Sequence, residues 1–259
     1  MRFKEFKSLM MEGGNIFKDA TGTPITTRIS KEAIPETIQW LESITGLPLV
    51  NNTLGSVGKK ESSGDLDIAV DETAISKDQL VERLTAFVQK MGKDPKAWIR
   101  KSGISVHFLT PIRGDAQQGY VQTDFMFGPD IEQMKFGLWS AGDASKYSGA
   151  DRNLIMSSIA KSTGMKYSWQ KGLMNRESEQ VITTNPDAVA QYLLGKGATQ
   201  KDLESVESIM ARLAQTPQRV EYLRALVSKL RDSKDKKPGI IKSDNEEAAR
   251  IENALRVIA

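Results

Sequence analysis

Two aspartates, Asp65 and Asp67, have the types and spacing in this chain that most directly indicate chemistry. They lie two residues apart in an apolar stretch that predicts a β-strand over 66–70, so both carboxylates leave the same face of that strand. Two like charges this close resist joint ionisation unless a cation lies between them. Carboxylate oxygens suit Mg²⁺ or Mn²⁺, which complete their coordination shells with water and substrate phosphates. The pair therefore predicts a divalent-metal site.

A glycine-rich loop comes directly before the aspartate pair. Its glycines let backbone N–H groups approach an anion closely, and Lys59 and Lys60 add positive charge. A phosphate-binding loop beside a metal-binding carboxylate pair predicts phosphoryl or nucleotidyl transfer. We call residues 54–64 the phosphate-binding loop; its sequence is Leu54-Gly55-Ser56-Val57-Gly58-Lys59-Lys60-Glu61-Ser62-Ser63-Gly64.

A third carboxylate, Asp124, lies in a stretch that predicts a strand over 120–128. A carboxylate in such a strand is costly to bury without a partner or a metal. Asp124 is therefore the predicted third ligand of a two-metal site. His107 lies in another predicted strand, 105–112, where we expect it on the polar face near the cleft.

The order of these features resembles the nucleotidyltransferase superfamily, which carries Gly-Ser, a short loop, Asp-x-Asp on a strand and a lone Asp on a later strand. Within it, the segment 61–67 looks closest to the palm of family X, the DNA polymerase beta-like enzymes. Further likeness lies in Tyr147-Ser148-Gly149-Ala150-Asp151, in residues 153–166 and in residues 186–195, so the resemblance covers about residues 50–198.

The resemblance implies roles for individual residues. Asp65, Asp67 and Asp124 would be catalytic and would hold two Mg²⁺ or Mn²⁺ ions. The triphosphate would contact the phosphate-binding loop, and the sugar and base would contact a later segment. The implied nucleotide-binding residues are Gly55, Ser56, Lys59, Lys60, Ser63, Gly64, Tyr147, Ser148, Gly149, Asp151 and Asn153.

Two departures from the family pattern keep the acceptor open. The loop is one residue shorter and lacks the family's phosphate-binding arginine, for which Lys59 or Lys60 would substitute as a point charge. The segment before Gly55 is too short for the DNA-gripping domain of family X. We expect transfer of a nucleoside monophosphate from an NTP or dNTP to a DNA or RNA 3′-hydroxyl. The alternatives are a protein or small-molecule acceptor, or a non-catalytic binding or assembly protein on this fold.

The helices and strands that must position these residues can be predicted from the sequence, and their order indicates an α+β fold with a small mixed sheet. Helical spacing of apolar residues predicts helices over 34–44 and 77–91, which flank the predicted strands. Later helices are predicted over 186–194, 199–213, 217–230 and 243–257, with capping boxes at Thr199 and Ser243. We therefore expect an N-terminal arm (1–30), a nucleotidyltransferase palm-like core (31–198) and a helical C-terminal region (199–259) able to dock a protein partner.

The composition limits the chemistry further. The 259 residues include no cysteine and one histidine, which excludes a thiol nucleophile, a cysteine-based zinc or iron–sulfur site and a multi-histidine metal centre. A net charge of +3 permits nucleic-acid binding without requiring it. No apolar run is long enough to span a bilayer, and the N-terminus lacks a signal peptide's apolar stretch. We expect a cytoplasmic protein without a membrane partner.

Overall fold

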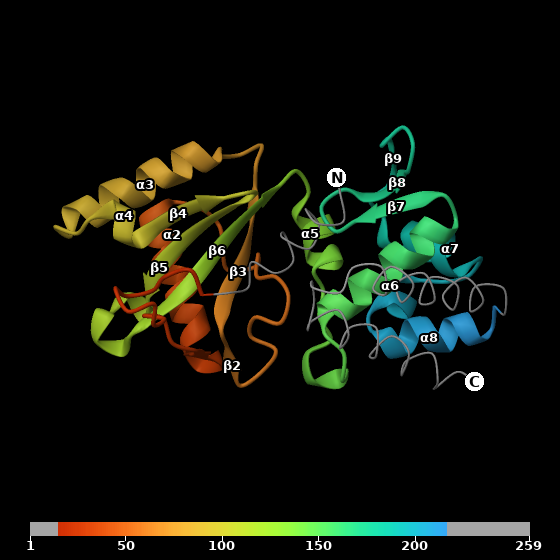
Figure 1. Ribbon diagram of the computed structural model, residues 1–259, viewed down its shortest axis with the longest axis horizontal. Helices are drawn as coiled ribbons and strands as arrows, with labels where there is room; N and C mark the ends of the chain where they lie inside the picture. Colours follow the sequence, from red (N-terminus) through yellow and green to blue (C-terminus); the bar gives the residue numbers. More distant parts are fainter. Residues whose placement is uncertain (1–14, 217–259) are drawn as a thin grey trace. The chain divides into compact units, whose positions relative to one another are not determined.

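The computed structural model describes residues 15–216, and the chain divides between Lys135 and Phe136 into two units, each coloured along the sequence in Figure 1. Unit 1 is described over residues 15–135 and unit 2 over 136–216. The dividing point lies inside one helix, α5 (Ile131–Gly137). The region predicted as one palm-like domain, 31–198, thus spans both units. Its buried apolar side chains form two separate clusters, one in each unit.

Unit 1 is built on a four-stranded mixed sheet in the order β3-β6-β5-β4. Strand β3 is parallel to β6, and the other neighbours are antiparallel. The predicted strands and the two predicted helices are confirmed, and none of their ends shifts by more than one residue. The elements are β1 (Ile29–Ser30), α2 (Ile34–Thr45), β2 (Ser62–Ser63), β3 (Asp65–Asp71), α3 (Lys77–Lys90), α4 (Pro95–Trp98), β4 (Ile99–Ser102), β5 (Ser105–Pro111) and β6 (Tyr120–Gly128), with short 3₁₀ turns at Lys31–Ala33, Ile112–Gly114 and Ala116–Gln118.

Alternation along the strands gives the sheet of unit 1 two different faces. One face is apolar and packs against the buried stripes of α2 and α3, which include Ile38, Leu41 and Leu84 (Figure 1). Helix α2 ends at Gly46, which takes a left-handed φ of 67°, and α3 begins at a capping box made by Ser76 and Gln79. The opposite face of the sheet carries the polar residues.

Residues 15–30 belong to unit 1, which differs from the predicted N-terminal arm. Phe17 and Ile29 are buried in the core of unit 1, and β1 pairs antiparallel with β2. The backbone N–H of Ile16 also donates to Gln122 Oε1 at 3.0 Å. Apolar side chains here are sparse and without period, which is why the sequence does not predict their burial. Residues 1–14 of the predicted arm lie outside the described residues.

Unit 2 combines a three-stranded antiparallel sheet, β7-β8-β9, with helices that share one apolar core. The predicted helix over 186–194 is confirmed. The elements are α6 (Gly149–Ser162), β7 (Met165–Ser168), β8 (Gly172–Asn175), β9 (Val181–Thr183), α7 (Pro186–Leu194) and α8 (Val206–Ala214), with 3₁₀ turns at Gly142–Ala144 and Gln200–Leu203.

Residues 199–216 are part of the core of unit 2 and form no separate appendage. Leu203, Ile209 and Leu213 are fully buried in the same apolar cluster as α6 and α7. The predicted capping box at Thr199 is present, but it begins a 3₁₀ turn, and α8 starts afresh at a second capping box on Ser205. The helices predicted over 217–230 and 243–257 lie outside the described residues.

The structure confirms the expected α+β class, with small sheets and several helices. Within the part of the chain that the structure describes, no helix is both long enough and apolar enough to cross a membrane.

Candidate active site

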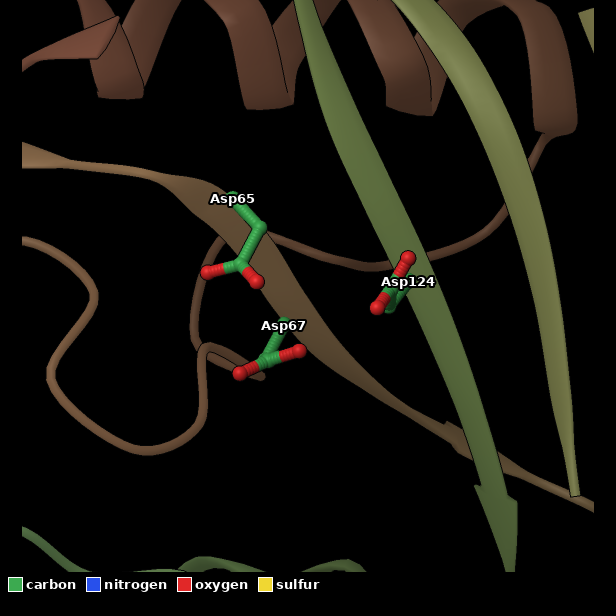
Figure 2. A group of neighbouring side chains, drawn as sticks. All are labelled: Asp65, Asp67 and Asp124. Atoms are coloured by element: carbon green, nitrogen blue, oxygen red, sulfur yellow. The ribbon is translucent and has the colours of Figure 1, made fainter. Parts of the chain in front are cut away.

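The three predicted carboxylates meet on the polar face of the sheet in unit 1. Asp65 and Asp67 lie on β3 and Asp124 on the neighbouring strand β6, where Asp67 and Asp124 are register partners. Figure 2 shows the three side chains turned toward one another from these two strands. One ligand oxygen from each residue lies within 4.8 Å of the other two. The structure thus brings together carboxylates from distant parts of the sequence.

Asp67 is the carboxylate with the least support from its surroundings. No group among residues 15–216 donates a hydrogen bond to its side chain. Burial, followed by repulsion from Asp65 and Asp124, raises the pKa of Asp67 well above its ordinary value of 3.8. The pKa of Asp65 is raised by the same causes, burial first and then Asp124, while Arg28 opposes the increase. A cation between these side chains would offset both the cost of burying the charged carboxylates and their mutual repulsion.

Asp124 is held by two donors from the same face of the sheet. His107 on β5 is its cross-strand partner, and His107 Nδ1 lies 2.7 Å from Asp124 Oδ1. Gln122 Nε2 donates to Oδ1 at 2.9 Å and to Oδ2 at 3.2 Å. These contacts occupy three of about four acceptor positions on the carboxylate, which leaves one on Oδ2. Asp124 can therefore bind a cation through Oδ2 without losing its partners.

His107 and Gln122 are functional candidates that the sequence analysis underestimates. His107 is on the polar face, as expected, but it is only 2 % exposed and acts on Asp124. The alternation of apolar and polar residues along β5 and β6 indicates that His107 and Asp124 each lie on the polar face of their strand. The pairing itself depends on the register between the strands, which no sequence pattern gives.

The donor set fits Mg²⁺ or Mn²⁺. All three candidate ligands are carboxylates, so the site offers hard oxygen atoms and neither sulfur nor imidazole nitrogen to a cation directly. His107 does not offer its nitrogen to the cation but hydrogen-bonds Asp124 Oδ1 at 2.7 Å. A bond of this kind, from a residue behind the metal ligands, fixes the orientation of the ligand Asp124. Asp65, Asp67 and Asp124 are therefore the residues that would hold the ions.

The phosphate-binding loop is attached to β3 at its start. The Leu54 N–H donates to the Asp67 C=O at 2.9 Å, which places Gly55 and Ser56 directly after a backbone contact with the carboxylate strand. Consecutive turns follow, with Lys59 N–H donating to Ser56 C=O at 3.1 Å. Gly55 and Gly58 take φ values of 61° and 72°, a left-handed conformation that side chains disfavour. The glycines predicted from the motif are thus required by the turns.

The end of the loop is fastened at β2 by an arginine that directly precedes β1. Arg28 Nε donates to Ser62 Oγ at 2.9 Å, and Arg28 Nη2 donates to the Ser62 C=O at 2.7 Å. Ser63 is buried, and its hydroxyl makes no hydrogen bond with any described residue. Sequence analysis missed Arg28 because it lies far from the loop in sequence and approaches it only through the pairing of β1 with β2.

The remaining predicted nucleotide-binding residues lie in unit 2, at the start of α6. Ser148 and Asp151 form the capping box of this helix: Asp151 Oδ2 accepts from Ser148 N–H and Oγ, both at 2.8 Å. Tyr147, Ser148 and Gly149 line a pocket whose empty volume is about 160 Å³. That volume includes open solvent and the enclosed part is close to zero, so this pocket does not hold a nucleotide as folded. The roles of these residues toward a nucleotide stay predictions.

The next two residues of α6 are buried and bonded within unit 2. Arg152 is 1 % exposed, donates to the carbonyls of Phe136 and Leu203, and lies over the Phe136 ring at 4.9 Å. Asn153 donates to the Gly137 C=O at 2.6 Å and accepts from Arg152. We call Arg152 and Asn153 with these carbonyls the Arg152 cluster. The predicted base contact of Asn153 would have to compete with these bonds.

Comparison with known proteins adds no relative: neither the protein-family models nor the curated proteins include a match to this chain. The functional argument therefore depends on the residues and their geometry.

Proposed function

We propose that this protein is a metal-dependent nucleotidyltransferase with a palm-like unit 1, in which Asp65, Asp67 and Asp124 are the catalytic carboxylates. The observation that carries the proposal is the position of Asp67, partly buried between two other carboxylates with no donor among the described residues. Such an arrangement is costly without a cation. The phosphate-binding loop supports the same reading, because its first turn is bonded to the backbone of Asp67.

The proposed reaction is an in-line displacement at the α-phosphorus of a nucleoside triphosphate. The acceptor hydroxyl oxygen forms a bond to the α-phosphorus, and the bond from that phosphorus to the bridging oxygen of the β-phosphate breaks. Pyrophosphate leaves with the electron pair, and the hydroxyl proton passes to solvent. Two Mg²⁺ or Mn²⁺ ions held by Asp65, Asp67 and Asp124 would supply Lewis-acid activation of the acceptor oxygen and would stabilise the charge on pyrophosphate.

The chain's own groups orient the reactants. Asp65, Asp67 and Asp124 supply the negative charge that fixes the ions, and His107 and Gln122 hold the Asp124 carboxylate in place. The backbone N–H groups around Gly55 and Ser56 would bind phosphate oxygens, since Gly55, at a left-handed φ of 61°, has no side chain of its own to hinder a close approach. We propose a nucleic-acid 3′-hydroxyl as the acceptor, on the resemblance of residues 147–151 to family X.

A transfer assay with a matched pair of variants tests the proposal. The protein is incubated with α-labelled NTPs and dNTPs and with Mg²⁺ or Mn²⁺, and separately with a primer-template, bulk tRNA and a protein extract. We expect label in the primer or the RNA and release of pyrophosphate. Asp67→Asn should lower the rate by about a thousandfold or more, because transition-state charge is no longer stabilised.

Asp71→Asn is the control, since Asp71 ends the same strand but is occupied by a turn to Thr73. It makes the same chemical change as Asp67→Asn and should leave the rate within about twofold. Label that appears only in protein or in a small molecule would replace the proposed acceptor. Equal behaviour of the parent and Asp67→Asn with every acceptor would exclude the enzyme and favour a binding or assembly role.

A further inference from the structure

Residues 15–26 form a folded loop beside β6, which we call the N-terminal loop. Its two arms pair as a hairpin, in which the Ile25 N–H donates to the Phe17 C=O at 3.1 Å. The Phe17 side chain is 2 % exposed and lies in the apolar core of unit 1, so it anchors the loop. The neighbouring residue, Ile16, is therefore held at a fixed place on the surface of unit 1.

The N-terminal loop is bonded to β6 close to the proposed metal site. The Ile16 N–H donates to Gln122 Oε1 at 3.0 Å, and the Thr27 N–H, directly after the loop, donates to the Tyr120 C=O at 2.7 Å. Gln122 lies two residues before Asp124 on the same face of β6, and its Nε2 donates to both carboxylate oxygens of Asp124. One side-chain amide thus joins the backbone of the loop to a proposed metal ligand.

The Gln122 amide can support Asp124 in only one of its two orientations. With Nε2 toward the carboxylate it donates, whereas with Oε1 toward the carboxylate two acceptors would repel each other. Among residues 15–216, the Ile16 N–H is the one group that donates to Gln122 Oε1. Gln122 is 2 % exposed, so its Oε1 is shielded from water and would be costly to leave unpaired. The Ile16 N–H thus selects the orientation in which Nε2 faces Asp124.

We propose that the N-terminal loop is a positioning element of the metal site, in which the Ile16 N–H orients the Gln122 amide and the amide orients Asp124. The inference rests on the proposed function for the identity of the site. An Asp124 carboxylate that keeps His107 on Oδ1 and Gln122 on both oxygens presents its free position on Oδ2 in a fixed direction. Without the Ile16 N–H, the carboxylate would turn more freely and bind a cation more weakly.

A purely structural loop, which only covers the core through Phe17, is the competing explanation. The two roles differ in what they require of Gln122. A loop that only stabilises unit 1 affects Mn²⁺ binding whether or not residue 122 carries an amide. A loop that acts through the amide has nothing to orient once the amide is gone, so the effect of Ile16 should vanish in a Gln122→Met background.

Titration of Mn²⁺ into the full chain, followed by electron paramagnetic resonance, measures the effect. Gln122→Met should raise the Kd for Mn²⁺ by about tenfold, as for other outer partners of a metal ligand. Ile16→Pro removes the backbone N–H and should raise the Kd by about three- to tenfold. In the Gln122→Met background, the same Ile16→Pro change should alter the Kd by less than about twofold.

Two control variants isolate the N–H. Ile16→Ala keeps it and shortens a side chain that is 36 % exposed, so the Kd should stay within about twofold of the parent. Ala20→Pro places a proline elsewhere in the same loop. It occupies the second position of the turn that the Gly22 N–H closes on the Asp19 C=O at 3.0 Å, where proline is favoured and no N–H is needed. Its Kd should also stay within about twofold.

An equal loss from Ile16→Pro with and without the Gln122 amide would overturn the inference. Equal Kd values for Ile16→Pro and either control variant would do the same, and in both cases a parent that binds Mn²⁺ leaves the proposed function standing. If Ile16→Pro lowers the urea midpoint, the α-hydroxy acid analogue of isoleucine at position 16 decides in its place, because it exchanges the N–H for an ester oxygen and keeps the side chain.

The proposed function fails in a different way. A parent that binds no Mn²⁺ overturns the inference together with the proposed metal site. Mn²⁺ binding that depends on the Ile16 N–H, without transfer to any acceptor, would keep the positioning role and reject the transferase.

Discussion

Buried polar groups gather in both units, but the two clusters differ in how many hydrogen-bond partners the protein gives them. The Arg152 cluster of unit 2 pairs a buried cation with carbonyl oxygens and the Asn153 side chain. The carboxylates of unit 1 face one another, and Asp67 has no donor among the described residues. In the Arg152 cluster, protein oxygens accept from Nε and Nη1 of the guanidinium, and these bonds stabilise unit 2. The carboxylate cluster lacks such partners at Asp67, which is the reason that we propose it as a cation-binding site.

Asp124 lies between these extremes and shows that burial alone is a poor guide. It is as buried as many core residues, at 6 % exposed, yet His107 and Gln122 satisfy much of its carboxylate. The cost of burying Asp124 is therefore largely offset by protein partners. The case for a cation depends on Asp67 and Asp65, whose pKa values burial and mutual repulsion raise.

The largest effect that we expect from this contrast is the loss of stability on removal of Arg152. Arg152→Met leaves the carbonyls of Phe136 and Leu203 without their donor and should cost unit 2 about 3 kcal/mol of unfolding free energy. Urea unfolding measures it, with Lys161→Met, an exposed charge on the same helix, as the control. An Arg152→Met variant as stable as Lys161→Met would show that the cluster is not structural.

Removal of His107 should weaken the metal site more than the fold. His107→Phe takes away the donor to Asp124 and should raise the Kd for Mn²⁺ by about ten- to a hundredfold, the usual range for outer ligand partners. His107→Asn places an amide donor near the position of Nδ1 and should recover much of the affinity. Titration of Mn²⁺ followed by electron paramagnetic resonance gives both values. If the two variants bind Mn²⁺ equally, orientation of Asp124 is not the role of His107.

The Asp67 pKa shift gives a pH dependence of the metal-free protein with a definite sign. Its raised pKa means that the folded state binds a proton more tightly than the unfolded state, so the stabilisation is present below about pH 4 and is lost as the pH rises through the folded pKa. Asp67→Asn cannot ionise there, so with a chelator its Tm should exceed that of the parent by an amount that grows as the pH rises above about 4 and levels off above the folded pKa of Asp67.

Mg²⁺ should reduce the difference in Tm between Asp67→Asn and the parent, because Mg²⁺ stabilises the parent, which alone retains all three carboxylate ligands. Asp71→Asn serves as the control and should show no pH-dependent gain. A parent whose Tm relative to Asp67→Asn is flat across this pH range would mean that Asp67 is not held in a costly state.

The smallest expected effect concerns Asp151, which the family resemblance assigns to the nucleotide. As a capping residue, Asp151→Ala should cost about 1 kcal/mol of stability and leave the KM for the triphosphate unchanged. Glu177→Ala, an exposed carboxylate of unit 2, is the control for the lost charge. A tenfold rise in KM without a change in the urea midpoint would instead place Asp151 at the nucleotide.

The sequence predicts those parts of the fold whose residues repeat with a regular period. The alternation around Asp124 and the apolar stripe of α3 identify a strand and a helix, and both are confirmed. The boundary inside α5 is not predicted, because local periodicity does not say which core a helix joins. The sequence likewise predicts one long helix from the capping box at Thr199. The structure instead has a 3₁₀ turn there and a new helix that begins six residues later, at the capping box on Ser205.

The candidate site divides in the same way. The Asp65 and Asp67 pair and the loop before it are local in sequence, so their spacing is informative. The contacts of His107 with Asp124 and of Arg28 with Ser62 depend on which strands pair and in which register. Such contacts come from tertiary structure, and a single sequence contains no signal for them.

The parallel pairing of β3 with β6 has a consequence for how the site forms. Parallel neighbours need a long connection, and here residues 72–119, with α3, α4, β4 and β5, lie between them. Asp67 and Asp124 therefore meet only after most of unit 1 has folded, since a pairing over this separation carries a large loop-closure cost. A cation held between them would slow the unfolding of unit 1 and leave its folding rate almost unchanged.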